Sequence, residues 1–169
     1  IAVDASGNLY IADSQNVRIQ KWAPGDTTGT TVAGGNGYGS AANQFANPYD
    51  VAVDASGNVY IADRDNHRIQ KWAPGDTTGT TVAGGNGQGS AANQLESPRG
   101  IAIDVSGNVY IADGGNHRIQ KWAPGDTIGT TVAGGNGQGS AANQLNRPYE
   151  VAVDASGNVY IADGRNHRI

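Results

Sequence analysis

The stretch Asp54-Ala-Ser-Gly-Asn-Val-Tyr-Ile-Ala-Asp63, followed two residues later by Asn66-His-Arg-Ile69, decides the fold of this chain. Close copies begin at Asp4, Asp104 and Asp154, so the stretch occurs four times at a spacing of 50 residues. A fixed period of this length is typical of an array whose units bury their hydrophobic faces against one another. We therefore divide one domain into units 1–50, 51–100 and 101–150 and a partial unit 151–169.

Each unit is expected to form four short β-strands. Asp54 begins a tight hairpin turn in which Gly57 supplies a positive φ, and the Val59–Ala62 run has strong β propensity. Pro74 and Gly75 interrupt pairing after the third strand. The strands are predicted at residues 51–54, 59–62, 67–72 and 80–83 of the second unit.

A glycine-rich segment at residues 84–98 separates the fourth strand from the next unit. We expect a long flexible connector with one turn of helix at residues 90–94. Leu95 is its large apolar residue and is expected to hold the loop against the body of the protein. The glycines lack the Lys-Ser/Thr ending of a phosphate-binding loop, so we predict no nucleotide there.

Four antiparallel strands in a unit of about 40–50 residues are typical of a β-propeller blade. The strands do not alternate cleanly between apolar and polar residues, which fits a blade covered on both faces by its neighbours. A β-solenoid is the alternative, but hairpin turns after Asp54 and Asp63 oppose its parallel coils. We predict an all-β propeller of four-stranded antiparallel blades.

Composition excludes several classes of function. A net charge of −4 argues against non-specific binding of nucleic acid, which needs a basic face. The chain has no cysteine, and no apolar run approaches the roughly 20 residues that span a bilayer. We expect neither a membrane span nor a cofactor.

The string Gly57-Asn-Val-Tyr-Ile-Ala-Asp63 with Asn66-His-Arg-Ile69 resembles the NHL repeat, and the likeness covers essentially the whole chain. Val17 replaces the histidine of the motif in the first unit, and the glycine-rich segment makes each unit longer than many members. The resemblance implies a β-propeller, most often with six blades. Propellers of this family serve as interaction platforms, RNA readers, receptor ectodomains and, in one branch, zinc-dependent amidating lyases.

The number of units poses a problem of closure, because the fourth stops early in its third strand and an open ring exposes strand edges. The chain also begins at Ile1 and contains no methionine, so we expect a piece of a longer protein. Three arrangements are open: a longer array, a four-bladed ring, and copies that associate to close a ring. We expect self-association or a longer array.

His67, His117 and His167 recur once per unit and invite a zinc interpretation. Equivalent positions on successive third strands diverge around a ring, so we predict no metal site. Asp54 and its neighbours also lack the twelve-residue pattern of an EF-hand.

An Asp and an Arg flank the turn between the second and third strands of every unit. We expect each pair to meet as a structural clasp. The pairs are Asp13–Arg18, Asp63–Arg68, Asp113–Arg118 and Asp163–Arg168.

Units two and three differ at ten positions, and six of the differences change a charge. All six lie in the turn between strands two and three or where the long loop enters strand one, which is one end of an antiparallel blade. Loops on a rigid scaffold commonly carry binding residues. We predict ligand contacts near the channel mouth from Tyr49, Asp50, Arg99, Tyr149 and Glu150, and farther out from Arg64, Asp65 and Arg165. Drift on a tolerant face is the alternative explanation.

These observations favour a non-catalytic scaffold that binds a protein, peptide or polar small ligand on the face around the central channel. One alternative is an amplified or designed repeat with no ligand. Another is a piece of a zinc-dependent lyase-like propeller whose site residues lie outside this chain.

Overall fold

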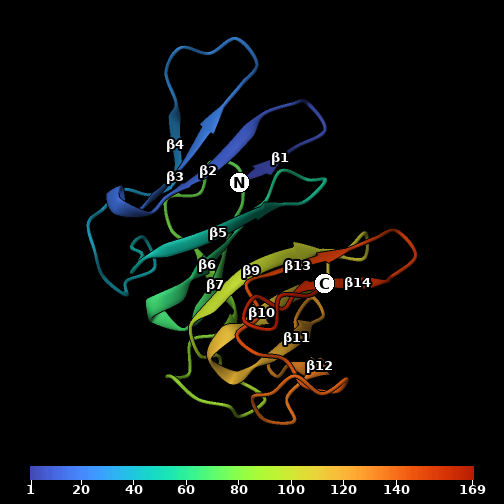
Figure 1. Cartoon of the computed structure of the whole chain (residues 1–169). Helices are drawn as coiled ribbons and strands as arrows, with labels where there is room; N and C mark the ends of the chain where they lie inside the picture. Colours follow the sequence, from blue (N-terminus) through green and yellow to red (C-terminus); the bar gives the residue numbers. More distant parts are fainter.

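The computed structural model describes residues 1–169, and sheets of β-strands follow one another along the chain (Figure 1). We call the sheets blades 1 to 4. The first three have four antiparallel strands in sequence order, and the last has two. Blade 1 contains β1 (Ala2–Val3), β2 (Leu9–Asp13), β3 (Arg18–Trp22) and β4 (Thr30–Gly34). Blade 2 contains β5 (Pro48–Val53), β6 (Val59–Asp63), β7 (Arg68–Trp72) and β8 (Thr80–Gly84). Blade 3 contains β9 (Pro98–Ile103), β10 (Val109–Asp113), β11 (Arg118–Trp122) and β12 (Thr130–Gly134), and blade 4 contains β13 (Glu150–Val153) and β14 (Val159–Ala162).

The hairpin between the first two strands of each blade is built around an aspartate. In blade 2, Asp54 Oδ1 accepts hydrogen bonds from the amides of Ser56 and Asn58, both at 2.9 Å. Its Oδ2 accepts from Asn58 Nδ2 at 2.7 Å and from the Tyr60 hydroxyl at 3.2 Å. Burial alone would raise the pKa of Asp54, but these donors together hold it below its usual value. The predicted turn is therefore present, with Gly57 at φ +80°.

Short 3-10 helices form the next turn of each complete blade: η1 (Ser14–Asn16), η2 (Arg64–Asn66) and η3 (Gly114–Asn116). The residue that follows, His67 in blade 2, is left-handed with φ 52° and lies outside the sheet. The third strand therefore begins at Arg68, one residue later than predicted, because a left-handed residue cannot continue the pleat.

The first strand begins earlier than predicted, at Pro48 rather than Val51. Proline is tolerated as the first residue of a strand because it removes no hydrogen bond from the interior of the ladder. Tyr49 and Asp50 consequently lie on a strand, and not on the loop that enters it.

The prediction of a helical turn at residues 90–94 is wrong. The segment makes a single turn, in which the amide of Gln94 donates to the carbonyl of Ala91 at 3.0 Å. Its carbonyls turn toward Arg118, which donates to Ser90, Ala91 and Gln94. The loop predicted to be a flexible connector is thus tied to the next blade.

The hydrophobic core lies between blades. Between blades 2 and 3, one side supplies Tyr60, Ala62, Ile69, Ala83 and Leu95, and the other supplies Ile101, Val109, Ile111 and Trp122. Equivalent residues fill the junction between blades 1 and 2; between blades 3 and 4, Val159 and Ile161 are only partly buried. Leu95 is completely buried, so it holds the glycine-rich loop as predicted.

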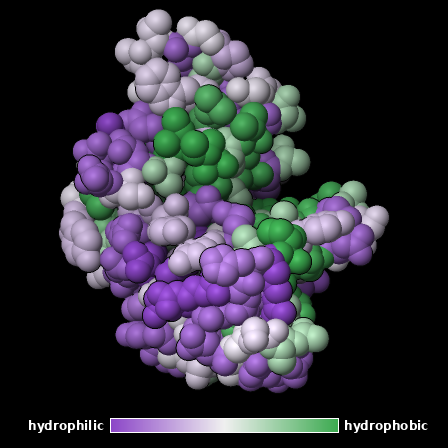
Figure 2. Space-filling model, viewed as in Figure 1, coloured by the Kyte–Doolittle hydropathy of each residue, from purple (hydrophilic) through white to green (hydrophobic).

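The two end faces of the array carry the same kinds of residue but lack a neighbour. Leu9 of blade 1 is 42% exposed, whereas its equivalent Val59 is 4% exposed; Tyr160 of blade 4 is 51% exposed, against 5% for Tyr60. Figure 2 shows hydrophobic surface over the β1–β2 end and over the β13–β14 end. The predicted all-β fold with four-stranded antiparallel blades is confirmed. No helix is long and apolar enough to cross a bilayer.

Candidate functional site

Four side chains that differ between units form a row across blades 2 to 4. The first strands of these blades, β5, β9 and β13, lie side by side (Figure 1). Arg64 Cζ lies 5.8 Å from the centre of the Tyr49 ring, and Arg99 Cζ lies 5.9 Å from the same ring. Arg99 Cζ is also 4.3 Å from the centre of the Tyr149 ring. We call Arg64, Tyr49, Arg99 and Tyr149 the arginine–tyrosine row, in which every contact is within cation–π range.

Two glycines make room for the row. A Cβ atom at Gly114 would lie 3.1 Å from both Cδ and Nε of Arg99. A Cβ atom at Gly164 would collide with the ring of Tyr149. Arg64 occupies the equivalent position in blade 2, where it reaches Tyr49 instead. The row therefore depends on matched residues at two separate positions of each unit.

Arg99 is the most buried member of the row, with 9% of its surface exposed. Its Nε atom is buried without a hydrogen-bond partner. Removal from water lowers the pKa of Arg99; the phenols of Tyr149 and Tyr49 oppose this shift, and the positive charges of Arg64 and Arg147 add to it. The site is thus an electropositive spot framed by aromatic rings.

Two carboxylates, Asp50 and Glu150, lie at the positions that follow Tyr49 and Tyr149, on the first strands β5 and β13. Asp50 Oδ2 accepts a hydrogen bond from the amide of Ile101 at 3.0 Å. Glu150 packs against Gly100, where a Cβ atom would clash with its carboxylate. Desolvation, followed by the negative charge of Asp50, raises the pKa of Glu150 from 4.5 to about 7.

The predicted binding residues therefore fall into three places. Tyr49, Arg99, Tyr149 and Arg64 come together in the row, although Arg64 was expected farther out. Asp50 and Glu150 lie close to each other on β5 and β13, outside the row. The other two lie outside both groups: Asp65 Oδ1 is 3.7 Å from Arg64 Nε, and Arg165 is exposed and makes no ion pair or cation–π contact with the row.

Sequence reasoning missed three contributors to the site: Arg147, Gly114 and Gly164. Arg147 and Gly114 stand at positions where units two and three differ, so the signal was present. To predict their role, one must know which side chain of one blade lies over which turn of another. That relation depends on tertiary contacts and not on spacing along the chain.

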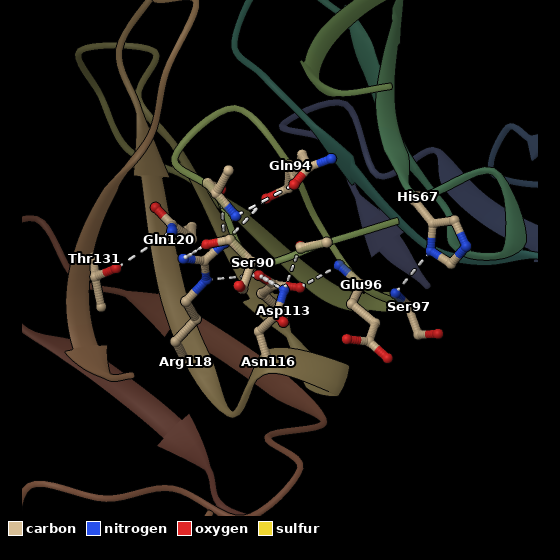
Figure 3. Close-up of polar contacts among 12 residues, drawn as sticks. His67, Ser90, Gln94, Glu96, Ser97, Asp113, Asn116, Arg118, Gln120 and Thr131 are labelled. Atoms are coloured by element: carbon tan, nitrogen blue, oxygen red, sulfur yellow. Dashed lines mark hydrogen bonds and ion pairs between the residues drawn. The ribbon is translucent and has the colours of Figure 1, made fainter. Parts of the chain in front are cut away.

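The aspartate–arginine pairs form the clasp of each blade, and Figure 3 shows that of blade 3. Arg118 Nε donates to Asp113 Oδ2 at 2.8 Å, Nη1 donates to the carbonyl of Ser90 at 2.8 Å, and Nη2 donates to those of Ala91 and Gln94. Asn116 adds bonds to Asp113 and to the carbonyl of Gly89. The pairs Asp63–Arg68 and Asp163–Arg168 repeat this arrangement, whereas Arg18 of blade 1 bonds only Asp13.

Two of the three recurring histidines accept a hydrogen bond from the backbone of the loop that follows their blade. His67 Nδ1 accepts from the amide of Ser97 at 3.1 Å, and His117 Nδ1 accepts from that of Arg147 at 3.0 Å. Burial, followed by the charge of Arg147, lowers the pKa of His117. No group of three or more His, Cys, Asp or Glu side chains is placed to hold a metal ion.

The opposite face holds a cavity of about 920 Å³ between blades 1 and 2. It is lined by the hairpin turns that begin at Asp4 and Asp54 and by the turns at residues 23–26 and 73–76. The residues of these turns are nearly identical in every unit, and each aspartate of the first pair is satisfied by its own hairpin. The residues of the row differ between units, whereas those of the cavity are nearly identical. The row is therefore the better candidate for a specific ligand-binding site.

Comparisons with known proteins agree with this architecture. The family model of the NHL repeat matches residues 45–72, 95–122 and 145–169. A search of curated protein sequences gave no match.

Solved structures share the fold at low sequence identity. A structural genomics protein of unknown function from Bacteroides thetaiotaomicron is 24% identical, with a TM-score of 0.74 over 99% of this chain and 44% of that one. An auxiliary nutrient binding protein from the same organism is 20% identical, with a TM-score of 0.74 over 98% and 44%. A streptogramin B lyase is 15% identical, with a TM-score of 0.65 over 98% and 48%. The chain spans less than half the length of these structures, and the likeness shows the fold alone.

Proposed function

We propose, from the premise that this chain belongs to the NHL-repeat β-propellers, that it is a non-catalytic scaffold which binds a ligand on the face carrying the arginine–tyrosine row. The single observation that supports this most is the gathering of varied residues into one row on otherwise uniform blades. Blade 1 contributes no residue to the row, yet it packs on blade 2 through the same kind of hydrophobic junction. The row is therefore not required for the packing of one blade on the next.

The chemistry of the row suits a protein, a peptide or a polar small ligand. Tyrosine and arginine are enriched at interfaces, where they supply large rigid contact areas and directed hydrogen bonds. Tyr49 is 43% exposed and Tyr149 is 37% exposed, so both rings are accessible to a partner. The overall charge of −4 disfavours nucleic acid as that partner.

Ligand selection tests the proposal. Random peptides displayed on phage and a library of polar small molecules are screened on the immobilised protein, and each ligand is then titrated against Tyr149→Ser. We expect affinity to fall by about tenfold or more, as at an interface hot spot. Val105→Ala is the matched control, because Val105 is 92% exposed in a hairpin turn at the opposite end and its equivalent in blade 2 is Ala55.

Two outcomes would contradict the binding role. One is ligands that bind wild type and Tyr149→Ser equally; the other is a failure of both libraries to yield a ligand. The second outcome would favour a purely structural repeat.

We propose in addition that another blade covers each end face, either from a second copy of this chain or from further units of a longer array. The support is the exposure of Leu9 and Tyr160: the position of Leu9 is buried in blades 2 and 3, and the position of Tyr160 is buried in blades 1 to 3. The two faces are complementary, because each carries one half of the same repeated junction.

Light scattering of the 169-residue chain distinguishes the occupants. A second copy predicts a species of at least twice 17.3 kDa that dissociates when Leu9→Glu is introduced. A stable monomer would rule out association between copies and leave the longer array.

A further inference from the structure

Three arginines of this protein are buried, and two of them have a carboxylate partner. Arg68 and Arg118 bond Asp63 and Asp113 at 2.7 and 2.8 Å. Arg99 is equally buried but has no acidic neighbour within bonding distance, and its Nε donates to nothing. An ionised group that is removed from water without a counter-charge destabilises the fold. Arg99 is therefore the one buried arginine of this protein that has no carboxylate partner.

The surroundings of Arg99 leave its hydrogen-bonding edge available. Tyr49 lies on the preceding blade and Tyr149 on the following one, so an aromatic ring contacts the guanidinium from each neighbour. Neither Nη atom donates to a protein acceptor, and both keep contact with solvent. A guanidinium presents parallel N–H groups that match the two oxygens of a carboxylate or a phosphate.

The nearby charges also favour an anion. Arg64 and Arg147 both act on Arg99 as like charges. Asp65 partly offsets Arg64 at 3.7 Å, and no carboxylate offsets Arg99. The carboxylates of Asp50 and Glu150 lie on adjacent strand positions, where side chains point to the other side of the strand.

We propose that the ligand of this face carries an oxyanion, a carboxylate or a phosphate, and that Arg99 binds it while Tyr49 and Tyr149 hold the guanidinium in place. This inference rests on the proposed binding function of the same face. It narrows the ligand to an acidic peptide or an acidic small molecule.

Nuclear magnetic resonance of the ¹⁵N-labelled protein tests the proposal directly. The Nε–Hε signal of Arg99 is assigned by its loss in Arg99→Gln. Inorganic phosphate and acetate are titrated separately, with sodium chloride at matched ionic strength as the control. We expect a saturable shift of the Arg99 signal with at least one of the two oxyanions and none with chloride. The oxyanion that saturates at lower concentration identifies phosphate or carboxylate as the preferred group.

Thermal unfolding of Arg99→Gln gives an independent measurement. Because the variant removes a buried charge that has no partner, it should unfold at the same temperature as wild type or higher when no oxyanion is present. Phosphate or acetate should stabilise wild type and leave the variant unchanged. Arg165→Gln is the control, since Arg165 is exposed and makes no ion pair or cation–π contact with the row; it should keep the response to the anion.

Three outcomes would overturn the inference: an Arg99 signal that follows ionic strength alone, anion stabilisation that persists in Arg99→Gln, or a large loss of stability in that variant without anion. The last would make Arg99 a structural residue. Ligands from the library screens provide the distinction between the two proposals. If they bind Arg99→Gln as tightly as wild type but bind Tyr149→Ser weakly, the proposed oxyanion contact is wrong and the proposed binding function stands.

Discussion

At the scale of single residues, the left-handed position before each third strand separates the first unit from the others. His67, His117 and His167 occupy it with φ between 52° and 55°, and Val17 occupies it with φ 47°. A β-branched residue rarely adopts this conformation. Val17 also offers no acceptor to the amide of Asn47, whereas the equivalent amide of Ser97 bonds His67.

Replacing Val17 with histidine should therefore stabilise the protein. Relief of backbone strain and one added hydrogen bond together contribute about 1–2 kcal/mol, and each kcal/mol raises the melting temperature by about 2–4 °C in a chain of this size. Thermal unfolding followed by circular dichroism measures the change. The reverse substitution, His117→Val, should lower the melting temperature by a similar amount. A Val17→His protein that melts at or below the wild-type temperature would show that strain at this position is negligible.

At the scale of elements, the clasp joins a blade to the loop that precedes it. Arg68 bonds Asp63 in its own blade and the carbonyls of Ser40, Ala41 and Gln44 in the preceding glycine-rich loop. The loop can therefore be rich in glycine and still be held in one path, because its exposed carbonyls have a fixed donor.

Arg68→Ala should cost about 3–5 kcal/mol of unfolding free energy, because it leaves the fully buried carboxylate of Asp63 without its cation. Arg18→Ala removes the same ion pair from blade 1, where both side chains are partly exposed and no loop is bound. Its cost should be below about 1 kcal/mol. Urea denaturation of both variants measures the difference. Equal losses in the two proteins would mean that the loop contacts and burial contribute nothing beyond the pair itself.

The repeat in the sequence predicted these elements because each hairpin and clasp depends on residues close together in one unit, such as Asp54 with Asn58 or Asp63 with Arg68. Strand ends were predicted less well. Pro48 was placed in a loop and His67 in a strand, since neither the permitted proline nor the left-handed residue alters the hydrophobic pattern. The arginine–tyrosine row could not be predicted as a set of contacts, because Arg99 meets Tyr149 only through the docking of separate blades.

At the scale of the whole molecule, the first strands of blades 2, 3 and 4 bring two carboxylates together that are 100 residues apart in the chain, Asp50 and Glu150. Desolvation and then Asp50 raise the pKa of Glu150 from 4.5 to about 7. A carboxyl group whose pKa is raised by folding favours the folded state while it is protonated. Its contribution is therefore present below pH 4.5 and is lost as the pH rises toward 7.

Glu150→Gln should accordingly raise the melting temperature at pH 8 and change it little at pH 4.5, since the amide resembles the protonated acid at all pH values. Thermal unfolding of wild type and variant across this range measures the effect. Asp50→Asn should reduce the pH dependence without abolishing it, because desolvation is the larger cause of the shift. A difference between wild type and Glu150→Gln that is the same at both pH values would contradict a raised pKa.

The near-identity of the junctions between blades has a consequence for how the chain reaches this state. A face built by Tyr60, Ile69 and Leu95 fits the face of the next blade, but it fits every other copy of that face almost as well. During refolding, blade 3 can dock on blade 1 and leave blade 2 looped out, with the hydrophobic junction intact. Such slipped states are compact and must be undone before the correct order forms. Because the junctions are nearly identical, they do not specify the order in which the blades pack. The arginine–tyrosine row is one of the few sets of contacts that form only when the blades pack in the correct order.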